Sequence, residues 1–357
     1  MSKVLAASLV AVVFSAALFI YSVIDPGPYG ATEPVAGATG SRGPVPLPAR
    51  ASGSPSTDTR HAALGPDLVA PDATRSIGLH VASMDELLAF YDAMDFGVEF
   101  WRPSEKGVPP VILADLPDSW VADLGSGTKK SLFYRAVLPL VLQINNEIMA
   151  DRATVLVHIA DRANGNAGDR AGLARLGAIA IAYGVLSPPP DKGKPFVPQF
   201  SAAVLKQLAT RVDAIPVSMA LGQAAYESGY TTSRFATGDN SLFGPWRDGD
   251  GMRPRGRRVE RGNEGRYATA LDSTRAYARN LNTHPAYEEF RGVRATMRAE
   301  TDILDGHALA AALVMYSQSG VTYTNTLRAL IAENNLSQVD AAVLRDEETV
   351  RVVAVIK

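Results

Sequence analysis

The stretch from Val4 to Ile24 constrains the fold most, because its 21 residues carry no charge and only Met1, Ser2 and Lys3 precede it. A helix of this length spans roughly 30 Å, the hydrocarbon thickness of a bilayer. The alternative is a cleaved secretory signal, whose apolar stretch is usually about 7–15 residues long and ends in small residues. Here the later residues, 18–21, are bulky. We therefore predict one transmembrane helix within residues 1–24, retained as an anchor, with its N-terminus inside.

Residues 25–75 have a different composition, with nine prolines and seven glycines in 51 positions. Apolar residues are scattered through this stretch without a period. Such a segment cannot bury enough apolar surface to offset the entropy lost on ordering. We predict a disordered linker between the membrane and a folded body.

The whole chain has 357 residues, 46% of them hydrophobic, a net charge of -2 and no cysteine. The absence of cysteine excludes disulfides and thiolate metal sites. The five histidines never form a His-Glu-x-x-His pair, so we expect no metal site, and no motif indicates another cofactor. The near-neutral charge argues against a nucleic-acid partner.

The region 76–197 is predicted to be mainly helical. Ser83 to Glu86 forms a capping-box pattern at the start of a helix that continues through Tyr91. Residues 98–116 contain three prolines and are expected to be extended. Apolar residues then recur at helical spacing from Lys129 to Ala163. Polar residues 145–147 interrupt this pattern and are best explained as a solvated face.

A shorter helix between Pro216 and Gly229 carries the most informative carboxylate, Glu227. Proline suits a first helical turn and glycine suits the end of a helix, so Glu227 falls in the last turn. There the helix dipole disfavours the anion, and packing by apolar neighbours would desolvate it; both effects raise the pKa. A carboxylic acid that stays protonated is what glycosidic cleavage needs. A solvated helix-terminal glutamate is the alternative. The expected apolar neighbours are Met219, Leu221, Phe235 and Phe243.

Several sequence motifs share one resemblance. Ala-Tyr-Glu-Ser-Gly-Tyr at 225–230 precedes Asn-Ser-Leu-Phe-Gly-Pro-Trp at 240–246, and further motifs follow at 277–287, 304–306, 316–320 and Tyr323. Together they resemble the N-acetylglucosaminidase domains of glycoside hydrolase family 73, the Bax-like proteins in particular. The resemblance implies a mainly α (α+β), lysozyme-like catalytic domain with a small β-hairpin lobe. We place this domain at 198–336, after the helical N-terminal region 76–197.

The resemblance also implies site residues. Glu227 matches the catalytic acid, and Tyr316 matches the active-site tyrosine of the family. The second carboxylate is expected on the hairpin, where both Glu260 and Glu264 fit and Glu260 is preferred. Participation by the acetamido group of the substrate is the alternative to a second carboxylate. Substrate-binding positions are implied at Tyr230, Asn240, Phe243 and Trp246.

The activity implied is cleavage of β-1,4 glycosidic bonds after N-acetylglucosamine in peptidoglycan glycan strands. A lytic transglycosylase that leaves anhydro-muramyl ends and a non-catalytic wall-binding protein are the alternatives. The expected partners are peptidoglycan and, through the N-terminal helix, the inner or cytoplasmic membrane, with the catalytic domain on the periplasmic or extracellular side. No feature fixes an oligomeric state. The tail 337–357 ends in an apolar run, Val350 to Ile356, expected to be an edge strand or a partner contact.

Overall fold

Two helices, one long and one short, organise the structure. The computed structural model describes residues 76–97, 99, 107–113, 125–166, 168–189, 199–231, 240–244 and 267–354. The predicted anchor and linker (1–75) lie outside the described residues, as do the hairpin lobe, Phe235, Trp246, Glu260 and Glu264. Among the helices that the structure does describe, none is both long and apolar enough to cross a bilayer.

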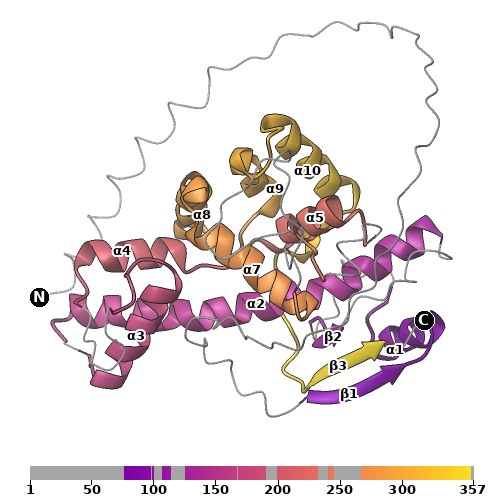
Figure 1. Ribbon diagram of the computed structural model, residues 1–357, viewed down its shortest axis with the longest axis horizontal. Helices are drawn as coiled ribbons and strands as arrows, with labels where there is room; N and C mark the ends of the chain where they lie inside the picture. Colours follow the sequence, from indigo (N-terminus) through magenta and orange to yellow (C-terminus); the bar gives the residue numbers. More distant parts are fainter. Residues whose placement is uncertain are drawn as a thin grey trace, which may run out of the picture. The chain divides into compact units, whose positions relative to one another are not determined.

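The long helix is α2 (Ser126–Ala163), which runs the length of the helical body in Figure 1. It forms where the apolar period predicts, and it continues through Pro139. It contacts α3, α4, α5, α7 and β2. Because helices from the region 198–336 pack directly on α2, the N-terminal region is part of the same core rather than an appendage.

The short helix α5 (Val217–Ser228) lies at the centre, in contact with α2, α9, α10 and η4. It begins after Pro216 and ends at Gly229, whose φ of 59° is left-handed, as predicted. Ten of its twelve residues are buried, which small side chains such as Ala220 and Ala224 permit. Gly306 of α9 approaches so closely that a Cβ there would collide with the Ser218 hydroxyl. The helix that carries Glu227 is therefore held on all sides.

The N-terminal region opens with a strand and a capped helix. Helix α1 (Met84–Ala93) begins at Ser83, whose hydroxyl accepts from the backbone N–H of Glu86, while Glu86 accepts from the N–H of Ala82. The Ser83 bond confirms the predicted N-cap, while the Glu86 side chain closes a variant of the capping box, because it binds the residue before the cap. Strand β1 (Ser76–Val81), which precedes the helix, was not anticipated. Strand β2 (Val111–Leu113) confirms part of the predicted extended segment.

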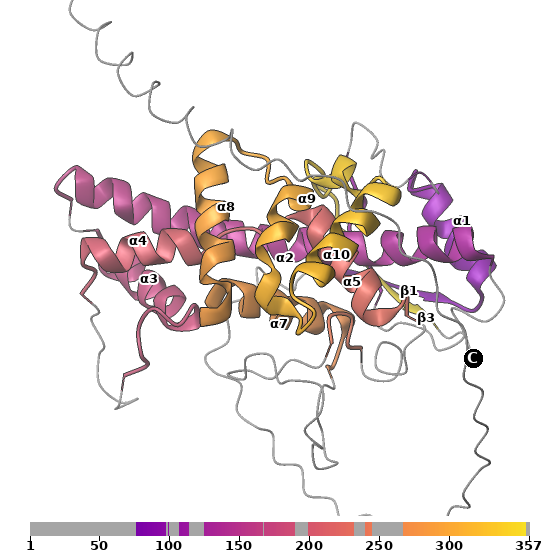
Figure 2. The same cartoon turned by 90° about the horizontal axis from the view of Figure 1, so that it is seen from above.

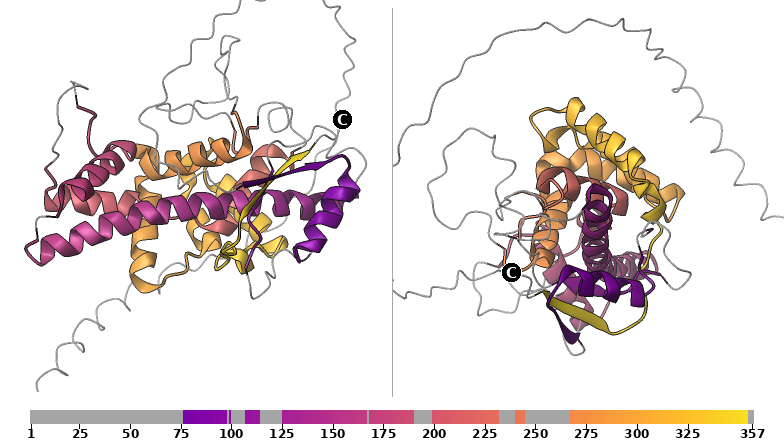
Figure 3. Two further views of the ribbon diagram at one scale, coloured as in Figure 1. Left: turned by 90° about the horizontal axis from the view of Figure 1, so that it is seen from below. Right: turned by 90° about the vertical axis from the view of Figure 1, so that its right-hand side faces the viewer.

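The apolar tail forms the middle of a sheet, so the prediction of an edge strand is wrong. Strand β3 (Thr349–Ala354) pairs in parallel with β1 on one side and β2 on the other, in the order β1-β3-β2. Ser76 lies opposite Thr349, and Val111 lies opposite Val350. Figure 3 shows the indigo β1 beside the yellow β3. A strand paired on both edges gains two ladders of hydrogen bonds, and apolar sequence alone does not distinguish this position from an edge.

The remaining elements surround α5 and extend along α2, as Figure 2 shows from above. The described chain is therefore mainly helical with one small parallel sheet. These elements are α3 (Arg170–Ala182), α4 (Ala202–Arg211), α7 (Ala270–Thr283), η1 (Pro285–Tyr287), α8 (Glu288–Glu300), α9 (Gly306–Leu309), η2 (Ala310–Ala312), η3 (Val314–Tyr316), α10 (Val321–Glu333) and η4 (Leu336–Val339).

Candidate active site

Glu227 lies in the last turn of α5, where its side chain is partly buried. Four tyrosines from separate elements lie close enough for its charge to raise the pKa of their hydroxyls. They come from α7, η1, η3 and α10, so the fold gathers them around one carboxyl group. They are Tyr277, Tyr287, Tyr316 and Tyr323.

A chain of buried hydrogen bonds leads to the carboxyl group. The Tyr277 hydroxyl donates to Oε1 of Gln223 at 2.6 Å, and Nε2 of Gln223 donates to the Tyr323 hydroxyl at 2.9 Å. The Tyr323 hydroxyl is in turn hydrogen-bonded to Glu227. Gln223 is fully buried one turn before Glu227 on the same face of α5. The orientation of the carboxyl group is thus tied to the core through an amide and two phenols.

The tyrosines are neutral hydrogen-bond donors at physiological pH. Burial, followed by the charges of nearby tyrosines and Glu227, raises the pKa of Tyr277 and Tyr316 well above the usual value of 10.0. Burial also raises the pKa of Tyr287 to about 12, and the charge of Glu227 adds to the rise. A phenol that does not ionise can donate to a carboxylate or to a sugar oxygen without adding a charge of its own. These side chains shape the site rather than supply a second titrating group.

Tyr316 and Phe243 brace the tyrosine cluster. The Tyr316 hydroxyl donates to the backbone oxygen of Phe243 at 3.2 Å, and the Tyr316 ring stacks on that of Tyr323 with centroids 5.4 Å apart. The Phe243 ring is fully buried and stacks on Tyr277 at 3.9 Å. The predicted active-site tyrosine is therefore beside Glu227, while the ring of Phe243 contributes through packing behind it.

Two other predicted substrate positions, Tyr230 and Asn240, contact the surrounding scaffold. The Tyr230 ring packs edge-on against Phe133 and Tyr134 of α2, and the hydroxyls of Tyr134 and Tyr230 are 3.2 Å apart. Asn240 is buried, and its amide reaches the backbone oxygens of residues 267 and 268 at 3.4 and 3.5 Å. The structure thus gives both residues contacts to the scaffold.

The N-terminal end of α5 is held by polar side chains. Asn145 of α2 donates to the backbone oxygen of Ile215 and accepts from its N–H, both at 2.8 Å. The sequence predicted a solvated face for residues 145–147, but Asn145 binds the backbone that precedes α5. Arg294 of α8 is fully buried and donates to backbone oxygens of residues 210, 211, 213 and 214 and to Asn282 Oδ1.

Asp340, just beyond η4, caps the same end of α5. Its carboxylate accepts from the backbone N–H of Ser218 at 2.7 Å, the Ser218 hydroxyl at 2.8 Å and the N–H of Gly306 at 2.9 Å. One side chain thereby holds the starts of α5 and α9 together. Sequence reasoning missed this residue because it lies 122 positions from its partner.

Two sequence comparisons identify the family of this chain. A family model described as mannosyl-glycoprotein endo-beta-N-acetylglucosaminidase matches residues 202–336. Over 239 residues the chain is 33% identical to Protein bax of Escherichia coli (strain K12), which is 66% of this chain and 78% of that protein. The chain belongs to the Bax-like glucosaminidase-domain family. No solved structure gives a significant match to this Bax-like chain.

The family match contains Glu227, Gln223 and the four tyrosines, while α2 and Asp340 lie outside the matched range. In this Bax-like protein, Glu227 and its tyrosine neighbours therefore lie in the matched range, while part of the support for α5 comes from outside it. In the part of the chain that the structure describes, no group of three His, Asp or Glu side chains is placed to hold a metal ion.

Proposed function

We propose that the protein cleaves β-1,4 glycosidic bonds after N-acetylglucosamine in the glycan strands of peptidoglycan, with Glu227 as the general acid. The observation that carries the proposal is the partly buried carboxyl group at the end of α5, enclosed by four tyrosines within the range matched by a glucosaminidase family model. The family match supports a glycan as the substrate. We further propose that the predicted N-terminal helix holds this activity at the membrane surface.

In the proposed reaction, Glu227 protonates the glycosidic oxygen as the bond to the sugar breaks. Tyr323 fixes the direction of the carboxyl group, and Gln223 fixes Tyr323. The positive charge that develops on the sugar then needs a carboxylate or an activated water on its other face. Glu260 is our first candidate for that part and Glu264 our second.

Mass spectrometry of muropeptides after digestion of purified peptidoglycan tests the proposal. Cleavage by the wild type should give reducing N-acetylglucosamine ends, and Glu227→Gln should reduce the rate by about 100-fold or more. Glu333→Gln is the matched control, because Glu333 also ends a helix but is exposed. Full activity in Glu227→Gln would exclude Glu227 as the acid.

The same digest separates the alternatives. Anhydro-muramyl ends would identify a lytic transglycosylase, a reaction that needs no second carboxylate. No cleavage by the wild type would favour a wall-binding protein. Glu260→Gln and Glu264→Gln should be tested separately. If the reaction is hydrolysis, replacing the true second carboxylate should lower turnover strongly, and replacing the other glutamate should not.

A further inference from the structure

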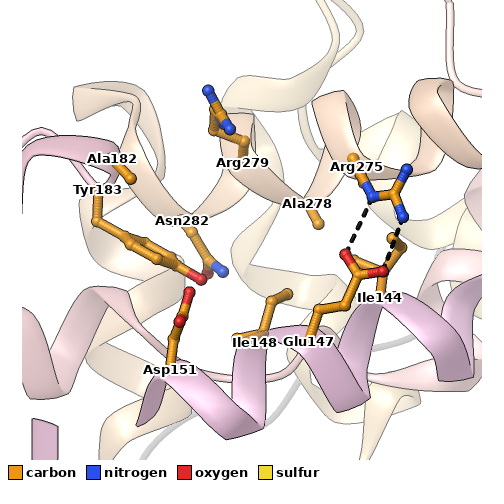
Figure 4. Close-up of a pocket in the computed structure, with 10 residues that line it drawn as sticks. All are labelled: Ile144, Glu147, Ile148, Asp151, Ala182, Tyr183, Arg275, Ala278, Arg279 and Asn282. Atoms are coloured by element: carbon orange, nitrogen blue, oxygen red, sulfur yellow. Dashed lines mark hydrogen bonds and ion pairs between the residues drawn. The ribbon is translucent and has the colours of Figure 1, made fainter. Parts of the chain in front are cut away.

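A pocket whose lining does not include Glu227 lies between α2, α7 and the end of α3 (Figure 4). It holds about 450 Å³ of space, part of it open to solvent. Helix α7 separates the two sites, since Tyr277 contributes to the tyrosine cluster while Arg275 and Ala278 line the pocket. The proposed hydrolysis uses none of the pocket's side chains.

One wall of the pocket is already neutralised. Arg275 donates through Nε and Nη2 to the two carboxylate oxygens of Glu147, at 3.0 and 2.8 Å (Figure 4). A two-point pair of this kind satisfies both groups and fixes their geometry. Ile148 and Ala278 line the pocket between this pair and the opposite wall, and Ile144 lies beside the pair (Figure 4). This wall offers packing but no spare charge.

The opposite wall holds Asp151 and Tyr183, whose polar ends point toward one another in Figure 4. The Tyr183 side chain is only 7% exposed, yet among the described residues its hydroxyl makes no hydrogen bond. The Asp151 side chain is 16% exposed, and its nearest described cation is Arg175 at 3.9 Å, beyond hydrogen-bond distance. Neither oxygen is among the described polar atoms that are buried without a partner, so the Tyr183 hydroxyl and the Asp151 carboxylate are both open to a ligand or water that donates a hydrogen bond.

The electrostatics of this wall favour a cation. Burial and the charge of Glu147 raise the pKa of Asp151, although Arg175 opposes the rise. Burial and the charge of Asp151 also raise the pKa of Tyr183, although Arg279 and Arg294 oppose this rise. Further negative charge at either group is therefore unfavourable. A positive group placed between them would stabilise the ionised Asp151.

We propose that this pocket binds a primary ammonium group carried on an alkyl chain, with Asp151 as its counterion and the Tyr183 hydroxyl as a second acceptor. An ammonium ion has three donors and no acceptor, which suits a carboxylate beside a phenol oxygen. The alkyl chain lies along Ile148 and Ala278. The lining also contains Arg279, but an anion placed at this wall would face the Asp151 carboxylate, because Glu147 is paired with Arg275. A neutral alcohol gains no ion pair.

The assignment of this amine to a natural ligand rests on the proposed function, the cleavage of peptidoglycan. The peptides attached to peptidoglycan strands include a diamino residue, which carries such an amine wherever it is not cross-linked. A site for it would direct the enzyme toward strands with free peptide amines. A free diamine such as putrescine is the other source of the same chemistry.

Saturation-transfer NMR with n-butylammonium and the purified full-length protein tests the pocket, with 1-butanol as the uncharged analogue. We expect saturable binding of the ammonium only. Asp151→Asn should weaken it at least 10-fold, and Tyr183→Phe about threefold, a loss of one hydrogen bond. Asp161→Asn, on the same helix, is the matched control and should change nothing. Arg175→Ala should tighten binding, because it removes a competing cation.

Equal binding of 1-butanol, or full binding by both Asp151→Asn and Tyr183→Phe, would overturn the proposal. Thermal unfolding of each variant checks that the fold is kept. Repeating the titration with Glu227→Gln separates the two proposals, since amine binding should persist in a protein that cannot cleave glycan.

Two further ligands separate the sources of the amine. A lysine-containing wall tripeptide that binds more tightly than n-butylammonium, and loses binding when its side-chain amine is acetylated, supports the peptide source. Putrescine that binds as tightly as that tripeptide supports the ammonium site but assigns it to free diamines.

Discussion

The two ends of α5 are built from different chemistry. At the N-terminal end, Asp340, Asn145 and Arg294 supply charged or amide groups that bind backbone atoms. At the C-terminal end, Glu227 is surrounded by neutral tyrosines. The first end therefore determines where the helix sits, and the second determines how its carboxyl group behaves. This division predicts that substitutions at the first end change stability, while those at the second change turnover.

Arg294→Met should have the largest effect on stability. It removes the donor for four backbone oxygens and Asn282 in a fully buried site, so we expect a loss of about 3 kcal/mol or more in the free energy of unfolding. Urea unfolding measures it. Arg298→Met on the same helix, where the side chain is 16% exposed, should cost clearly less. Equal losses would contradict a special role for the buried site.

Asp340→Asn should cost about 1–2 kcal/mol, because an amide accepts fewer of the three hydrogen bonds at the start of α5. The cost should also depend on pH. Burial raises the pKa of Asp340 above its usual 3.8, so the wild type loses stability as the pH rises through the folded-state pKa. Asparagine does not titrate.

The difference between the wild type and Asp340→Asn should therefore be larger near pH 4 than at pH 7. Paired urea unfolding at the two pH values checks this. A difference that grows toward pH 7 would show that the carboxylate, rather than the neutral acid, is the stabilising form.

Tyr323→Phe should reduce the rate of glycan cleavage by about 10-fold, equivalent to about 1.4 kcal/mol, because it removes the hydroxyl bonded to Glu227. Stability should fall by only about 1 kcal/mol, since the ring stacking on Tyr316 remains. Turnover and urea unfolding are measured on the same preparation. A variant that lost stability but kept its turnover would break the proposed contrast between the ends of α5.

Tyr277→Phe should have the smallest effect, a decrease of about threefold in turnover. Its hydroxyl acts one step further away, through Gln223. The ranking of Tyr277→Phe below Tyr323→Phe is the sharpest test of the hydrogen-bond chain. If Tyr277→Phe were the more damaging variant, the order of the chain would be wrong.

Local signals in the sequence predicted the elements that carry the acid. Pro216 and Gly229 bound α5 correctly and put Glu227 in its last turn, and Ser83 identified the start of α1. These features depend on neighbours within a few residues, so short patterns are enough to find them. The site residue Tyr316 came from the family resemblance instead.

Contacts between distant segments escaped prediction. Asn145 binds a backbone group 70 residues away, and its own neighbours on α2 give no sign of that. Gln223 looked like one polar residue among alanines, although its amide connects two tyrosines. The apolar run at the end of the chain had the right composition for a strand, but its central place in the sheet depends on β1 and β2, more than 230 residues earlier.

The central position of β3 has a consequence for biosynthesis. β3 leaves the ribosome after every other element that the structure describes, yet β1 and β2 cannot join one another without it. The helices around Glu227 can pack before β3 is available to pair with β1 and β2. A nascent or shortened product would thus expose unpaired strand edges to chaperones and proteases until β3 pairs with both strands.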